Sequence, residues 1–142
     1  MKVAIAADHG GFELKEALKK HLTGITLTDL GTHSTDSVDY PDYGADLARR
    51  VAAGEFERGI LICGSGIGIS IAANKVHGIR AALCHNAYTA EMARRHNDAN
   101  VIAMGGRVVD ENTAIEMTRI FLNTEFEGGR HARRVEKLNN IQ

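Results

Sequence analysis

Five short apolar runs alternate along this chain with longer segments whose apolar positions recur at helical spacing. The runs are rich in Val, Ile and Leu, and they predict β-strands over residues 3–7, 25–30, 59–63, 79–84 and 100–104. The first, third and fifth runs are apolar on both sides of the alternation, which is typical of buried parallel strands. Residues 25–30 alternate between apolar and polar side chains, so we place that strand nearer an edge of the sheet.

The segments between these runs predict helices. They are expected over residues 12–22, 42–54, 66–75, 87–95 and 111–122. The first carries apolar side chains on one face and three lysines, Lys15 among them, on the other. A basic amphipathic stretch over about 129–141 predicts a short C-terminal helix, whose apolar stripe of Val135, Leu138 and Ile141 is suited to packing on a second subunit.

A strand followed by a helix, five times over, predicts one α/β domain that occupies residues 1–142. Right-handed crossovers then give a three-layer, Rossmann-like fold, with a five-stranded parallel sheet and helices on both of its faces. In open sheets of this kind ligands bind outside the carboxyl ends of the strands. The turns after the first, third, fourth and fifth strands are therefore where we expect the chemistry.

Composition narrows the class of protein. The chain has 142 residues, 44% of them hydrophobic, with 17 Lys and Arg against 18 Asp and Glu. This near-neutral balance argues against a general affinity for nucleic acid or an acidic membrane. No apolar stretch reaches the ~18 residues of a membrane span, and the start of the chain lacks a secretory signal, so a cytoplasmic location is expected. The two cysteines, Cys63 and Cys84, do not have the spacing of a zinc or redox motif.

The 15 glycines gather beside the apolar runs, most densely in ILICGSGIGIS at 60–70. This segment is not a dinucleotide fingerprint, because Ile69 stands where the third glycine would be, and no Gly-Lys-Ser/Thr sequence of a P-loop occurs. Glycines at 64, 66 and 68 nevertheless let backbone N–H groups point at a ligand from the start of a helix, as in an anion site.

Cys63 precedes this loop, where the field of the N–H groups favours a thiolate. On these residues alone, it is equally well supported that Cys63 is a small core residue and that the glycines only allow close packing of helix and strand.

Other candidate side chains lie at the ends of other strands. Asp8 and His9 follow the first strand, and His96 and Asn97 enter the fifth. Arginines follow the fifth strand and fill the C-terminal stretch. Asp8 as a helix cap, His96 as a cation at a helix end and the arginines as a solvated face are the plain alternatives. Taken together, these groups are expected to converge at the ligand-binding edge of the sheet.

Several segments resemble the type B family of ribose-5-phosphate isomerases, which shares its fold with galactose-6-phosphate isomerase subunits. The matching segments are AADHGGFELK, DYPDY at 39–43, GILICGSGIGISIAANK, RRHNDANVIAMGGR at 94–107 and FEGGRHARRV at 126–135. The resemblance implies an aldose–ketose isomerase of the pentose phosphate pathway that acts on a phosphorylated sugar without metal or organic cofactor. It also implies a homodimer, or a tetramer of two dimers, with active sites between subunits.

The resemblance also implies a role for each matching residue. Cys63 would remove the proton from the carbon next to the carbonyl, His96 would open the sugar ring, and Asp8 would contact substrate hydroxyls. Some family members use a Glu farther along the loop in place of this cysteine, but the corresponding residues 67–73 here contain no carboxylate. The substrate-binding residues would be His9, Tyr43, Gly64, Ser65, Gly66, Ile67, Gly68, Asn97, Arg107, Arg130 and Arg134.

Within this set, the loop amides would hold the enediolate oxygen, while His9 and the arginines would bind phosphate. Ribose 5-phosphate is the expected substrate, and a hexose 6-phosphate such as allose 6-phosphate is the first alternative because it needs the same chemistry. A phosphosugar-binding module without catalysis and a cysteine hydrolase that uses Cys63 with His96 remain open. The sequence assigns no role to His131, Arg133 or Cys84.

Overall fold

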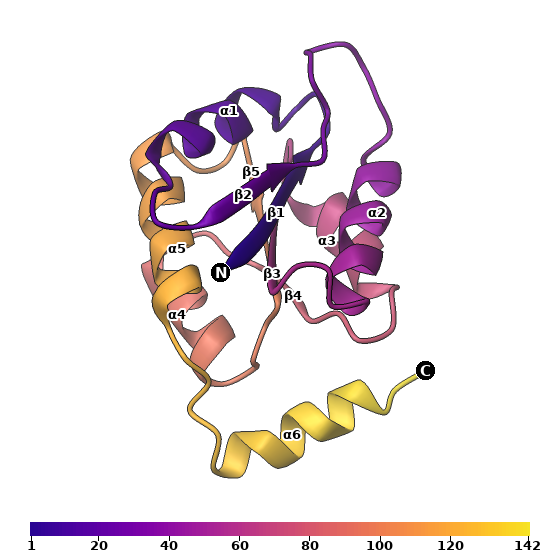
Figure 1. The fold of residues 1–142 in the computed structure, drawn as a ribbon, viewed down its shortest axis with the longest axis vertical. Helices are drawn as coiled ribbons and strands as arrows, with labels where there is room; N and C mark the ends of the chain where they lie inside the picture. Colours follow the sequence, from indigo (N-terminus) through magenta and orange to yellow (C-terminus); the bar gives the residue numbers. More distant parts are fainter.

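The computed structural model describes all 142 residues and contains every expected element, with small shifts at the ends (Figure 1). The strands are β1 (Lys2–Ala7), β2 (Thr26–Asp29), β3 (Arg58–Cys63), β4 (Ala81–Leu83) and β5 (Val101–Gly105). The helices are α1 (Phe12–His21), α2 (Tyr40–Ala52), α3 (Ile67–Asn74), α4 (Ala87–Arg95), α5 (Glu111–Asn123) and α6 (Arg130–Asn139). Helix α2 begins earlier than expected because Pro41, which needs no N–H partner, occupies its first turn.

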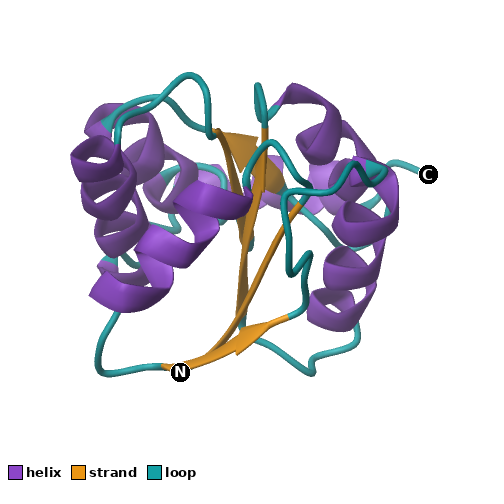
Figure 2. Ribbon diagram, turned by 90° about the horizontal axis from the view of Figure 1, so that it is seen from above, coloured by secondary structure: helices purple, strands orange, loops and turns teal.

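The strands form one parallel sheet in the order β2-β1-β3-β5-β4. Figure 2 shows this sheet between two layers of helices, which confirms the predicted three-layer fold. One apolar cluster joins the sheet to α1, α4 and α5, and a second joins its other face to α2 and α3. The alternating strand β2 lies at an edge, as predicted, and the short strand β4 forms the other edge.

Lys15 is the residue of α1 whose environment differs from the prediction. Its side chain is fully buried, because its Nζ donates to Asp29 Oδ2, 2.6 Å away at the end of β2. Lys19 Nζ donates to the same oxygen at 2.8 Å. Burial raises the pKa of Asp29, but the two lysines outweigh that effect and bring it down to about 2. The ion pair thus fixes α1 against the edge strand, and the end of β2 keeps its negative charge above that pH.

The strand order changes direction between β1 and β3. From β1 the chain crosses through α1 to β2 on one side, whereas from β3 it crosses through α3 to β4 on the other. The carboxyl ends of β1 and β3 therefore border the point where the winding direction reverses, which is where open α/β sheets bind ligands.

Helix α6 lies at the opposite, amino end of the sheet, apart from the two helical layers (Figure 1). The hydrogen bond from Arg80 Nη1 to Asn139 Oδ1, 2.8 Å long, ties this helix to the start of β4. Val135 is buried against the body of the chain, but Leu138 and Ile141 are 46% and 67% exposed. The predicted apolar stripe is thus only half covered within one chain. No helix of the chain is both long and apolar enough to cross a membrane.

Candidate functional site

Three glycine-rich turns pack against one another at the carboxyl ends of β1, β3 and β5. A Cβ atom on Gly10 would lie 3.0 Å from Gly64 N, and one on Gly106 would lie 2.7 Å from Gly10 O. Gly66 has a φ of +79°, and its Cβ would lie 2.7 Å from the carbonyl carbon of Met104. Side chains at these positions would push the turns apart, so the glycines bring three backbones together around one site.

Cys63 ends β3 at the floor of this site, and its side chain is buried. The N–H of Gly66 donates to Cys63 Sγ at 3.2 Å, and the N–H of Ile67 donates to Ser65 Oγ at 3.2 Å. The N–H groups of Gly64, Ser65 and Gly68 have no acceptor within the chain. The loop therefore offers one N–H group to the sulfur and three more to a ligand, at the positive end of α3.

Asp8 follows β1 and is buried beside the same loop. Its Oδ1 accepts from the N–H groups of Gly10 at 2.9 Å and Gly11 at 3.2 Å. This oxygen fixes the turn before α1, much as the plain alternative of a helix cap supposes. Oδ2 makes no hydrogen bond within the chain, so the same carboxylate can also bind a sugar hydroxyl.

His9 and Arg107 flank the glycine loop. His9 Nδ1 accepts from the N–H of Val38 at 3.2 Å, so the neutral ring carries its proton on Nε2 and can donate it to an anion. The Arg107 guanidinium lies over Gly64, where Nη1 would be 2.9 Å from an added Cβ. Arg107 forms no ion pair in the chain. Both donors are thus available to a phosphate group.

Two tyrosines of α2 face the site region. The Tyr43 ring lies against Gly31, where Cε1 would be 2.9 Å from an added Cβ. The Tyr40 ring lies against Gly68 of the loop itself, with Cζ 2.5 Å from the corresponding position. Sequence reasoning named Tyr43 and missed Tyr40, although both belong to the DYPDY segment and lie three residues apart at the start of one helix.

His96 and Asn97 do not join this group, contrary to the convergence expected from the sequence. His96 caps the end of α4, and both residues precede β5, at the amino end of the sheet. Asn97 lines a cavity there with residues of α6, Leu138 and Asn139 among them. Strand β5 alone spans about 15 Å at the ordinary rise per residue, so one chain holds Cys63 and His96 far apart.

Arg94 fixes the loop that carries His96 and Asn97. Its side chain is 4% exposed, and Nη1 donates to Asp98 Oδ1 at 2.8 Å and to Ala99 O at 2.7 Å. Its Nε donates to Thr124 O at 3.0 Å, which attaches the segment leading to α6. One guanidinium thus joins α4, the start of β5 and the approach to the last helix.

Arg94→Met should lower the free energy of unfolding by about 3 kcal/mol, because it leaves a buried carbonyl without its donor and Asp98 without its cation. Denaturant unfolding measures the change. Arg95→Met is the matched control, because the Arg95 side chain is 52% exposed and pairs only with Glu91. The control should lose less than about 1 kcal/mol. Equal losses in the two variants would contradict this role of Arg94.

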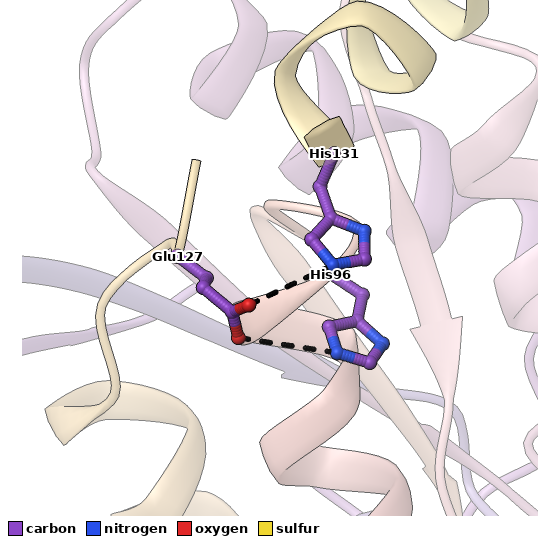
Figure 3. A group of neighbouring side chains, drawn as sticks. All are labelled: His96, Glu127 and His131. Carbon is purple, nitrogen blue, oxygen red and sulfur yellow. Dashed lines mark ion pairs between the residues drawn. The ribbon is translucent and has the colours of Figure 1, made fainter. Parts of the chain in front are cut away.

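His96 lies beside a residue to which the sequence assigned no role. The rings of His96 and His131 stack with centroids 4.2 Å apart and planes 13° apart (Figure 3). Burial lowers the pKa of His131, and the charge of His96 lowers it further, which outweighs the opposite effect of Glu127. Arg130 and Arg134 are exposed next to it and form no ion pair, so they too are available to an anion.

Cys84, at the end of β4, differs from Cys63. Burial raises the pKa of the Cys84 thiol to about 11, and its Sγ donates to Ala82 O at 3.6 Å. A thiol in this state is a small core group rather than a nucleophile or base. The plain interpretation of Cys84 therefore fits its surroundings.

The predicted residues form two groups at opposite ends of the sheet. The carboxyl end combines a thiol, backbone N–H donors, a carboxylate, His9 and Arg107, and these can hold a phosphorylated carbonyl compound and move a proton. The amino end combines His96, Asn97, Arg130 and Arg134, which can exchange protons and bind phosphate. Neither group contains every function that the sequence predicted for one site.

The known proteins to which this chain is similar are sugar or sugar-phosphate isomerases. The family model described as Ribose/Galactose Isomerase matches residues 3–138. The chain is 48% identical to ribose-5-phosphate isomerase B of Escherichia coli (strain K12), over 99% of this chain and 96% of that protein. It is 45% identical to D-erythrulose-4-phosphate isomerase of Pectobacterium atrosepticum, over 97% and 93%. The solved structure of ribose-5-phosphate isomerase B from Clostridium thermocellum superposes with a TM-score of 0.96 at 53% identity, over 98% and 95%.

Proposed function

The chain belongs to the ribose/galactose isomerase family of sugar-phosphate isomerases, and from this membership we propose that it interconverts ribose 5-phosphate and ribulose 5-phosphate through an enediolate. The observation that carries the proposal is the position of Cys63 Sγ beside the N–H donors of the glycine loop. Family membership sets aside the module without catalysis and the cysteine hydrolase. The pentose substrate, the catalytic base and the oligomeric state are the parts that we propose.

We assign the base to Cys63. Its thiolate takes the proton from the carbon next to the aldehyde, and the bonding electrons move onto the carbonyl oxygen. N–H groups of the loop stabilise that oxygen, a type of interaction worth about 3 kcal/mol per donor in a site shielded from water. The thiol then returns the proton to the first carbon, while the hydroxyl proton of the second oxygen passes to the first oxygen and the second oxygen becomes the ketone. Each atom of the aldose is thus retained in the ketose, and the sulfur ends in its starting state.

Ring opening and phosphate binding involve residues at both ends of the sheet. His96 takes the proton of the anomeric hydroxyl and delivers it to the ring oxygen as the bond between that oxygen and the anomeric carbon breaks, which exposes the aldehyde to the thiolate. Asp8 and Asn97 bind sugar hydroxyls. His9, Arg107, Arg130 and Arg134 bind the phosphate, and this remote binding orients the reacting carbons.

These roles require two copies of the chain, and we propose a homodimer whose sites lie between its subunits. The group containing Cys63 comes from one copy and the group containing His96 from the other. The half-covered stripe on α6 supports this assembly, because Leu138 and Ile141 are apolar and exposed in the single chain. In a twofold-symmetric pair each copy gives both of its groups, so two equivalent sites result. Pairing of two such dimers into a tetramer is compatible with this assembly, and a cytoplasmic location stays part of the proposal.

The substrate preference is tested by kcat/KM for matched sugar phosphates. Ribose 5-phosphate should give the highest kcat/KM. The value for allose 6-phosphate should be lower by at least about tenfold, because its additional carbon displaces the phosphate or the reacting carbons. The value for erythrose 4-phosphate should also be lower. A higher value for allose 6-phosphate would replace the pentose by a hexose in the proposal. A higher value for erythrose 4-phosphate would instead align the chain with its relative from Pectobacterium atrosepticum.

A further inference from the structure

Three metal-ligating side chains meet at the amino end of the sheet, outside the glycine loop (Figure 3). His96 closes α4, Glu127 lies in the segment before α6, and His131 is in the first turn of that helix. Their ligand atoms all lie within 4.8 Å of one another. Glu127 Oε1 is 3.8 Å from His131 Nε2, and its Oε2 is 4.0 Å from His96 Nε2. The carboxylate therefore faces both imidazoles.

His131 Nε2 is a buried polar atom without a hydrogen-bond partner in the chain. The residue is 5% exposed, and this nitrogen points toward the Glu127 carboxylate. A buried imidazole nitrogen without a partner is costly, so such atoms commonly serve a ligand. This nitrogen therefore points to a ligand at the cluster, independently of the distances between the three side chains.

We propose that His96, Glu127 and His131 bind one divalent transition-metal ion of the Zn²⁺ type, and that the bound ion inhibits the isomerase. Two imidazoles and a carboxylate, with a water on the fourth position, are a familiar zinc ligand set. Zinc–ligand bonds of about 2.0–2.1 Å place tetrahedral ligand atoms roughly 3.3 Å apart. The three ligand atoms, which now lie within 4.8 Å of one another, therefore need to approach by up to about 1.5 Å.

The two exposed members of the cluster can make this adjustment. The Glu127 and His96 side chains are 52% and 38% exposed, whereas His131 is held by its burial. The stacked rings direct their nitrogens to the same side, so His96 turns about its Cβ–Cγ bond until its lone pair meets the ion. The positive charges of Arg130 and Arg134 oppose the cation and weaken its binding. We therefore expect reversible binding rather than a permanent structural ion.

Inhibition follows from the identity of one ligand. A metal ion on His96 Nε2 occupies the lone pair that accepts the anomeric proton, so ring opening stops while the ion is bound. This consequence rests on the proposed function, whereas binding itself does not. No clustered metal motif marks these residues in the sequence, because the ligands come from the end of α4, the segment before α6 and the first turn of α6.

Cobalt titration tests the site directly, because Co²⁺ at a nitrogen and oxygen site of low coordination number has visible absorption bands. The wild-type dimer should bind one Co²⁺ per chain, and Zn²⁺ should displace it. Cys63→Ala should bind the same amount, which excludes the thiol as the ligand. Glu127→Gln should weaken binding at least about tenfold, while Glu125→Gln, an exposed carboxylate two residues away, should not weaken it.

The outcomes of these titrations distinguish metal binding from inhibition. Cobalt bands that persist unchanged in Glu127→Gln and in His131→Asn would overturn the site. Bands that depend on these residues, together with Zn²⁺ inhibition that EDTA reverses, would support both parts. Bands that depend on them without any inhibition would leave the metal site standing and contradict the proposed role of His96.

Discussion

Cys63→Ala is expected to lower kcat for ribose 5-phosphate by about 10²–10⁴-fold, the usual contribution of a positioned base. In the proposed mechanism Cys63 Sγ accepts the proton, and the N–H of Gly66 donates to this sulfur. The methyl side chain of alanine occupies part of the same small space, so the fold should be retained. Circular dichroism and denaturant unfolding check the fold, while coupled assays give kcat.

Cys84→Ala is the matched control for this variant. Cys84 also ends a strand and is also buried, but its raised pKa keeps it protonated. The control should retain the wild-type kcat. Deuterium from solvent reports proton abstraction itself, since the base exchanges the proton at the second carbon of the substrate. Undiminished exchange in Cys63→Ala would show that another group is the base.

His96→Asn is expected to lower kcat for ribose 5-phosphate by on the order of 10²-fold, the lower end of what general acid–base catalysis contributes. The loss should depend on the sugar. Ribose 5-phosphate closes a ring through its fourth oxygen, so the enzyme must open that ring before the thiolate can act. Erythrose 4-phosphate carries its phosphate on that oxygen and cannot close such a ring. Its turnover should therefore be nearly unchanged in the variant.

Comparing the two sugars separates ring opening from other roles of His96. If His96 held the phosphate or the enediolate, both sugars would lose rate to a similar extent. His21→Asn provides a control, because His21 ends α1 and pairs with Glu111, away from both groups of the site. Equal losses for the two sugars in His96→Asn would contradict the ring-opening assignment.

Most of the fold could be predicted because each element has its own local pattern. Buried strands such as β3 are apolar on both faces, and glycines mark the turns that follow them. The burial of Lys15 could not be predicted in this way. Its partner Asp29 lies in the next strand, and helical periodicity alone assigns a lysine to the solvent face. Contacts between elements are decided by packing that a periodic pattern does not contain.

Candidate residues and active sites between subunits were expected from the sequence, but the end of the sheet at which each candidate lies was not predicted. Asp8 and Cys63 each follow a strand, whereas His96 follows a helix and precedes a strand. In a parallel α/β sheet the first kind of turn lies at the carboxyl end and the second at the amino end. This difference was present in the sequence and would have separated the two groups. The stacking of His131 on His96 had no such signal, because it depends on where α6 packs.

In the proposed homodimer one active site takes Cys63 from one copy and His96 from the other. The most direct test combines Cys63→Ala and His96→Asn chains, with different affinity tags, and isolates the heterodimer. One of its sites then carries both substitutions and the other carries none. We expect the heterodimer to have about half of the wild-type activity per dimer, although each parent homodimer is nearly inactive. A heterodimer as inactive as its parents would show that both residues act from the same chain and would overturn the shared site.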